Sequence, residues 1–312
     1  MKYLDPKNDL TFKKVFGQHP HLLKSFLNAL LPLAEGQVIE SLQYLPTELV
    51  PEIPVLKNTI VDVRCTDNFG RQFIVEMQML WTDSFRNRIL FNASKAYIKQ
   101  LEKTKEYKLL QPVYALSLIN DTFEHQLPDF YHHYQIVNLL HPERQLKGLE
   151  FVFIELPKFK PQNISDKKLQ VLWLRYLTEI EDGTQNISAE LFENIEIKEA
   201  LEHIQESSFS KDELEQYDRY WDSVRTEKTL YLDAEIKGRA EGKAEGKAEG
   251  RAEGKAEGEL LNSYKVCMSA IRMNMKNEDI NKLTNLRFEK INKIIQLLQK
   301  YGDDAENHLS EV

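Results

Sequence analysis

The chain has 312 residues, of which 42% are hydrophobic and 29% are charged, and its formal net charge is −8 at pH 7. This acidic balance argues against a general nucleic-acid coat, and no run approaches the roughly 18 consecutive apolar residues of a membrane span. The first residues lack the apolar core of a signal peptide. Cys65 and Cys267 are far apart and have no Cys-x-x-Cys partner. A reducing, cytoplasmic setting is therefore expected, without a disulfide framework or a cysteine–zinc site.

The first half of the chain has the element order of an α/β domain. Apolar residues recur at helical spacing from Asp9 to about residue 30, and Pro20 suits the first turn of a second helix. Strands are predicted at about 37–45, 58–66, 71–80, 112–120 and 149–156, with one long amphipathic helix between the third and fourth strands, at about 83–107. This order predicts a mixed central sheet with flanking helices over residues 1–160.

The second half is predicted to be helical. Residues 161–236 form a helical extension, and residues 237–258 carry a repeat of Gly, base, Ala and Glu. Opposite charges three or four residues apart favour an exposed helical spacer, although the small residues could also pack two helices together. Residues 259–312 suggest two helices joined near Thr284, either a self-association hairpin that forms a homodimer or a helix-turn-helix DNA reader.

Charge is distributed unevenly along the chain. Residues 84–110 contain seven Lys or Arg against two Glu, a net charge of +5, whereas residues 178–235 have a net charge of −12. The first of these segments can face a polyanion and the second repels one. Contacts with DNA phosphates are therefore expected from the predicted basic helix, unless its cations form an ordinary solvated surface. The candidates are Arg86, Arg88, Lys95 and Lys99.

An acid stands in the middle of each of two adjacent predicted strands. The segment Asn68-Phe69-Gly70 suits a three-residue turn with Gly70 in the left-handed conformation. Such a turn pairs Asp67 with Arg71 and brings Asp62 opposite Glu76, with Cβ atoms about 5 Å apart. Two like charges in this arrangement require a compensating cation if they are buried.

The residues alone leave the nature of that cation open. Arg64 lies on the same face as Asp62 and could complete a buried ion-pair network with both acids. A divalent metal is the second interpretation, because carboxylate oxygens with open water positions suit Mg²⁺. An exposed edge hairpin is the third. The neighbouring histidines (His125, His132, His133 and His141) are assigned structural or solvent-facing roles because their surroundings are aromatic and apolar.

Thirteen residues separate Asp62 from Glu76, and one residue separates Glu76 from Gln78. This spacing resembles the D…(E/D)xK signature of the PD-(D/E)XK nuclease superfamily. Residues 1–235 resemble the Rpn family of recombination-promoting nucleases and transposase-like proteins. The segments that carry this resemblance are DLTFKKVFG, IVEMQ, RILFNASKAYIKQL, LPDFYHHYQI and FIELPKF. The resemblance implies a restriction-endonuclease-like αβββαβ core. It also implies a metal-dependent DNA endonuclease linked to recombination, mobile elements or defence, with double-stranded DNA as its partner.

The resemblance assigns roles by position. Asp62 and Glu76 would hold Mg²⁺, or Mn²⁺ in its place, with help from the backbone carbonyl of Met77. Gln78 takes the place of the superfamily lysine, and Asp9 matches an acidic position that assists the metal or its water.

Two departures from the signature bear on activity. Val61 stands where the superfamily has proline, and Gln78 adds no positive charge where lysine would. The alternative function is therefore a catalytically weak or inactive DNA- or partner-binding module that self-associates through its C-terminal helices.

Overall fold

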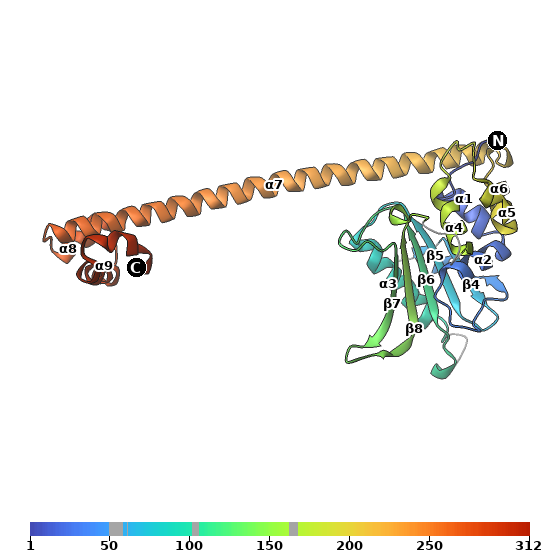
Figure 1. Ribbon diagram of the computed structural model, residues 1–312, viewed down its shortest axis with the longest axis horizontal. Helices are drawn as coiled ribbons and strands as arrows, with labels where there is room; N and C mark the ends of the chain where they lie inside the picture. The colour runs from blue at the N-terminus through green and yellow to red at the C-terminus, as the bar shows by residue number, and fades with distance from the viewer. Residues whose placement is uncertain (50–58, 61, 102–105, 162–167) are drawn as a thin grey trace. The chain divides into compact units, whose positions relative to one another are not determined.

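The computed structural model describes residues 1–49, 59–60, 62–101, 106–161 and 168–312. It divides the chain into two units, Met1–Lys228 and Thr229–Val312, and helix α7 (Lys211–Arg272) belongs in part to each (Figure 1). No helix within the described ranges combines the length and the apolar character needed to cross a membrane.

The first unit is built on a six-stranded mixed sheet with the strand order β1-β4-β5-β6-β8-β7. Three central strands are parallel to one another: β5 (Gln72–Gln78), β6 (Val113–Ile119) and β8 (His141–Glu155). The other three are antiparallel to their neighbours: β1 (Leu42–Tyr44), β4 (Val63–Asp67) and β7 (Tyr131–Asn138). Strands β2 (Glu48–Leu49) and β3 (Thr59–Ile60) form a separate antiparallel pair. Every residue of β6 is buried, which explains its almost unbroken apolar sequence.

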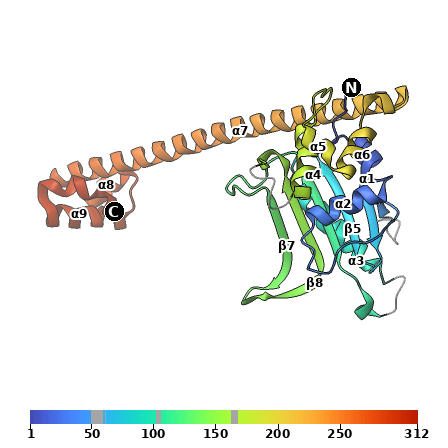
Figure 2. The ribbon, with the colours of Figure 1, turned by 45° about the vertical axis from the view of Figure 1, so that its right-hand side comes forward.

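Helices cover both faces of this sheet (Figures 1 and 2). Phe73 and Val75 of β5 face the larger core, which includes side chains of α1 (Asp9–Phe16), α2 (Pro20–Leu30), α4 (Lys168–Glu179), α5 (Ala189–Glu193) and α6 (Ile195–His203). Ile74 faces the other way, toward α3 (Asp83–Ile98). Because side chains alternate along a strand, Glu76 and Gln78 share the α3 face with Ile74.

The two helices next to the acids have well-defined N-termini. Asn8 caps α1 by accepting a hydrogen bond from the backbone N–H of Leu10 at 2.9 Å, so that Asp9 lies in the first turn. Thr82 caps α3 by accepting a hydrogen bond from the backbone N–H of Phe85 at 3.1 Å. Both helices are therefore anchored at their N-terminal ends.

The described residues also form four 3₁₀ helices, namely η1 (Tyr107–Leu109), η2 (Leu156–Lys158), η3 (Glu206–Ser208) and η4 (Gly302–Glu311).

The structure confirms the α/β fold with a mixed sheet and corrects several element boundaries. The helix predicted to reach residue 107 ends at Ile98, and residues 102–105 lie outside the described residues. Gln100 forms two hydrogen bonds with the backbone of Gln111, at 2.8 and 2.9 Å, which stabilises the chain reversal after α3. Strand β7 was not predicted, and the strand expected at 149–156 is the end of a longer strand that begins at His141. Most of the β7–β8 hairpin is exposed, so it lacks a strong apolar signal.

The second unit has a small hydrophobic core of its own. The end of α7, helices α8 (Asn277–Thr284) and α9 (Phe288–Tyr301), and η4 contribute to it, with Cys267, Ile280, Ile291 and Leu309 as one buried residue from each. The predicted turn between two helices is present, with Asn285 in the left-handed conformation at φ 57°. The Gly-containing repeat is helical, and a Cβ placed on any of its glycines would meet nothing within 4 Å among the described residues. Self-association through residues 259–312 remains a prediction.

Candidate active site

The β4–β5 hairpin brings the two acids level with each other. Gly70 has φ 81°, and its backbone N–H donates to Asp67 O at 3.0 Å, as the three-residue turn requires. The predicted register is confirmed along the ladder, where Val63 pairs with Val75. Asp62 directly precedes Val63, and Glu76 directly follows Val75.

Asp62 lies just outside β4 and is held by the neighbouring strand. Its Oδ2 accepts a hydrogen bond from the backbone N–H of Met77 at 2.7 Å. Burial raises the pKa of Asp62 to about 6, the Met77 hydrogen bond opposes this rise, and the charge of Asp9 adds to it. Asp62 also lines a cavity of about 530 Å³ together with Lys13 and Tyr44. The carboxylate is therefore fixed in position and borders an open space.

Glu76 is almost fully buried, with 4% of its surface exposed. Its Oε1 accepts a hydrogen bond from Asn92 Nδ2 at 3.0 Å, and its Oε2 lies 3.6 Å from Arg88 Nη2. Burial raises the pKa of Glu76 to about 7, and the charge of Asp62 is the second cause of the rise. Arg88 opposes the rise without cancelling it. Two neighbouring carboxyls thus hold their protons more tightly than isolated ones would.

Arg88 also contacts Gln78, the residue in the position of the superfamily lysine. Its Nη2 donates to Gln78 Oε1 at 2.9 Å, while Gln78 Nε2 donates to the carbonyl of Leu80 at 2.8 Å. Both polar groups of the Gln78 amide are therefore engaged by the protein. A guanidinium from α3 consequently supplies the positive charge that Gln78 lacks.

Two cations act on the acids: Arg88 forms an ion pair with Glu76, and the charges of Lys13 and Arg88 both act on Asp62. The ion-pair interpretation offered Arg64, whose Nη2 donates to Gln72 Oε1 at 2.8 Å. Arg88 and Asn92 are four residues apart on one face of α3, so both reach Glu76. The sequence contained a signal for Asn92, because a polar residue interrupts the otherwise apolar buried stripe of that helix.

Residues from distant parts of the chain complete the surroundings of Asp62. Asp9 in α1 forms an ion pair with Lys13, at 2.8 Å between Oδ1 and Nζ, and the charges of both act on Asp62. Tyr220 of α7 lies close enough that the charges of Asp9 and Asp62 add to the effect of burial in raising its pKa. Tyr220 is 158 positions after Asp62 and belongs to no motif, so sequence reasoning did not connect it with the acids.

The four predicted phosphate-binding residues do not act as one group. Arg88 points to the acids, whereas the Arg86 guanidinium lies 5.3 Å from the ring of Trp81. Lys95 and Lys99 lie about 10 and 16 Å beyond Arg88 along the helix axis, at 1.5 Å per residue. Of these four, the structure brings Arg88 to the acids and leaves the other three further along the helix or on another side of it.

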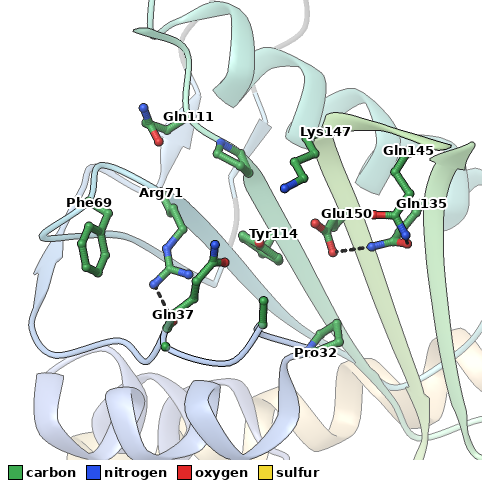
Figure 3. Close-up of a pocket in the computed structure, with 13 residues that line it drawn as sticks. Pro32, Gln37, Phe69, Arg71, Gln111, Tyr114, Gln135, Gln145, Lys147 and Glu150 are labelled. Atoms are coloured by element: carbon green, nitrogen blue, oxygen red, sulfur yellow. Dashed lines mark hydrogen bonds between the residues drawn. The ribbon is translucent and has the colours of Figure 1, made fainter. Parts of the chain in front are cut away.

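A polar pocket of about 510 Å³ lies at the other end of the sheet (Figure 3). Arg71, Tyr114 and Glu150 line it, and Arg71 directly precedes β5. Glu76 comes five residues after Arg71, about 17 Å further along an extended strand. This pocket is therefore separate from the acidic site.

A family model described as PD-(D/E)XK nuclease family transposase matches residues 6–231. The chain belongs to this family. The match includes every element that surrounds Asp62 and Glu76 and fits the resemblance to Rpn nucleases. No curated protein and no solved structure gives a significant match to the chain.

Members of the PD-(D/E)XK nuclease family typically use a divalent metal. Within the described ranges, no group of three or more His, Cys, Asp or Glu side chains is arranged to hold one. Two carboxylates nevertheless fit Mg²⁺, which is usually bound through one or two carboxylates, several waters and the substrate phosphate. Burial is the main cause of their raised pKa values, and a bound cation would favour their charged forms. Val61, in the place of the signature proline, lies outside the described residues.

Proposed function

We propose that this PD-(D/E)XK family member is a metal-dependent DNA endonuclease that hydrolyses phosphodiester bonds, with Asp62 and Glu76 at its centre. One observation supports this most directly: Asp62 and Glu76 stand level on adjacent strands, each held by a hydrogen bond, and Asp62 borders an open cavity. Burial also raises the pKa values of both carboxyls, and perturbed carboxyls of this kind are common at functional sites. Double-stranded DNA is the proposed substrate.

Asp62 and Glu76 would hold the divalent cation, Mg²⁺ or Mn²⁺, with the Met77 carbonyl as a further oxygen ligand. Such a cation, when bound, polarises a phosphate oxygen and makes water more acidic. The protein contributes position: the backbone N–H of Met77 orients Asp62, and the Asn92 amide orients Glu76. Asp9, paired with Lys13, adds negative charge beside Asp62.

Arg88 is proposed to stabilise the negative charge that develops on the phosphate during hydrolysis. Its side chain is 46% exposed, so it can reach a substrate while remaining in contact with Gln78 and Glu76. A fixed cation aimed at developing charge is the usual way in which protein groups lower such a barrier. Gln78 would then position Arg88 through its Oε1. Arg86, Lys95 and Lys99 remain candidates for contacts with more distant phosphates.

Nicking of supercoiled plasmid tests this proposal. The full-length chain should nick DNA in Mg²⁺ or Mn²⁺ and stop in EDTA. Asp62→Asn and Glu76→Gln should each lower the rate at least about 100-fold, a loss typical for a key charged group. Glu193→Gln on α5, where the acid is exposed, is the matched control and should cleave like the wild type.

Equal cleavage by the wild type and both site variants would refute the assignment. Retention of DNA without products in either metal would instead support the alternative, a DNA-binding module that has lost its chemistry. Both polar groups of the Gln78 amide form hydrogen bonds within the protein, whereas the ammonium group of a lysine at this position would contact the substrate directly. This difference gives the alternative a physical basis.

A further inference from the structure

An aromatic pocket of about 320 Å³ opens on the α3 side of the sheet. This volume is at the lower end of the range of about 300–1,000 Å³ found for ligand sites. Aromatic rings from three parts of the chain form its walls, and one arginine stands at its edge. The lining residues include Trp81, Phe123, Tyr134, Phe153, Arg86 and Glu124.

The strand register places this pocket beside the two acids. Glu76 on β5 pairs with Ser117 on β6, and Ser117 pairs with Phe153 on β8. Two strand spacings separate Glu76 from Phe153, which is about 10 Å. Trp81 comes three residues after Gln78, so one short segment joins the acidic site to the pocket.

The walls of the pocket suit a flat aromatic ring. Trp81 and Phe123 are stacked, with ring centroids 4.2 Å apart and planes 19° apart. Phe153 meets both Trp81 and Tyr134 edge-on, at 6.0 and 5.6 Å. Tyr134 lines the pocket and is 46% exposed, so a ligand can reach its side chain.

The edge of the pocket is polar and carries a cation. The Arg86 guanidinium lies 5.3 Å from the Trp81 ring, and Glu124 also lines the opening. The charges of Glu124 and Arg86 both act on the hydroxyl of Tyr134, which places that hydroxyl near them. An apolar wall with a cation at its edge is complementary to a heteroaromatic ring attached to a phosphate, and less so to an apolar helix.

Hydrogen bonds hold the pocket in shape without a ligand. The fully buried Glu155 accepts hydrogen bonds from the backbone N–H groups of Phe123 and Glu124, at 2.6 and 3.1 Å. Asp121 accepts a hydrogen bond from the backbone N–H of Trp81 at 2.9 Å. Both segments that carry the stacked rings are thus fixed in advance, which lowers the cost of binding.

We propose that this aromatic pocket binds one unstacked nucleobase of the DNA strand whose backbone passes Glu76. The inference rests on the proposed nuclease function and adds a subsite to it. A nucleotide next to the reacting phosphate can bridge the distance of about 10 Å once its base leaves the stack. The base packs against the exposed Tyr134 side of the aromatic wall, and Arg86 binds the phosphate attached to it.

Scanning an abasic site through a DNA strand tests this subsite. The full-length chain is titrated in EDTA, which prevents cleavage, against fluorescent single strands of about 15 nucleotides that each lack one base. Fluorescence anisotropy should show a loss of affinity of about tenfold at one position and little change elsewhere, because stacking of one base is worth about this much.

Substitutions in the pocket test whether the position-dependent loss of affinity arises there. Tyr134→Ala and Arg86→Gln should each abolish the dependence on position, since both side chains are exposed and the fold does not depend on them. Phe69→Ala is the matched control. Its exposed ring also has a guanidinium at 5.3 Å, that of Arg71, but it lies at the other end of β5 and should leave the scan unchanged.

The scan has three results that would overturn the inference: equal loss at every position, a positional loss that both pocket variants retain, or no measurable DNA binding. A flat scan of the wild type, together with a change of oligomeric state in Tyr134→Ala, would also overturn it and would show that a second copy covers the pocket. A different result would refute the proposed nuclease function alone. In that case the Asp62 and Glu76 variants would cleave plasmid like the wild type, while the wild-type scan would still show its loss at one position.

Discussion

The Glu76→Gln substitution replaces a buried carboxylate with a neutral amide of nearly the same size. The pKa of Glu76 is about 7, raised from an ordinary value of 4.5 first by burial and then by the charge of Asp62. The ionised carboxylate therefore destabilises the folded chain. Gln retains an oxygen that can accept the hydrogen bond from Asn92. We expect the variant to be more stable than the wild type above neutral pH in the absence of metal.

The expected gain is about 3 kcal/mol, since each unit of pKa shift corresponds to about 1.4 kcal/mol. Between pH 4.5 and about 7 the folded chain binds more protons at Glu76 than the unfolded chain does. The contribution of this group to the free energy of unfolding therefore falls as pH rises through that window and stays low above it. The advantage of Gln should be full at about pH 8 and close to zero at about pH 4.5.

Urea unfolding in EDTA at about pH 5 and about pH 8 measures this difference. Wild type, Glu76→Gln and the exposed control Glu193→Gln are compared at each pH. Adding Mg²⁺ at pH 8 supplies a second readout. A metal at about 100 times its dissociation constant should stabilise the wild type by about 2.7 kcal/mol and have a much smaller effect on Glu76→Gln.

Equal stability of wild type and Glu76→Gln at pH 8 would refute the reasoning, because the buried charge would then have no cost. A gain of the same size at pH 5 would also contradict it. In that case the amide would stabilise the fold by packing or hydrogen bonding, and the ionisation of Glu76 would not be the cause.

Three further substitutions test other parts of the argument. Arg88→Gln removes the cation beside Glu76, so it should lower plasmid cleavage about 100-fold and raise the pKa of Glu76 further, as followed by NMR titration. Asp67→Ala leaves the Arg71 guanidinium buried without its partner at 2.7 Å, and urea unfolding should show a loss of about 3–5 kcal/mol. Gly70→Ala places a side chain on a backbone with φ 81°, and the same assay should show a loss of about 1–2 kcal/mol.

The Arg88→Gln substitution has a matched control. The exposed Arg144 on β8 can be changed to Gln as a match for Arg88→Gln, and cleavage by that variant should not change. Wild-type cleavage by Arg88→Gln would remove the role proposed for its charge. If Asp67→Ala or Gly70→Ala unfolded at the same urea concentration as the wild type, the hairpin would not depend on its buried ion pair or on its turn.

Local chemistry made the core of the site predictable. The conformational freedom of Gly70 and the neighbouring polar residues determine a three-residue turn, and the turn determines the register. Since side chains alternate along each strand, that register alone aligns Asp62 with Glu76. The mixed sheet was predictable for a similar reason, because strands such as β6 are short and almost unbroken apolar runs in the sequence.

Tertiary structure decided which groups surround the acids. The sequence showed that a cation was needed and offered Arg64 from the same hairpin, but packing of α3 on the sheet brought Arg88 and Asn92 instead. Packing of α7 brought Tyr220 from far along the chain. Turn geometry depends on a few neighbouring residues, whereas the position of a helix on a sheet depends on the whole core. The sequence by itself therefore determined the pair of acids, and only the tertiary structure determined their electrostatic environment.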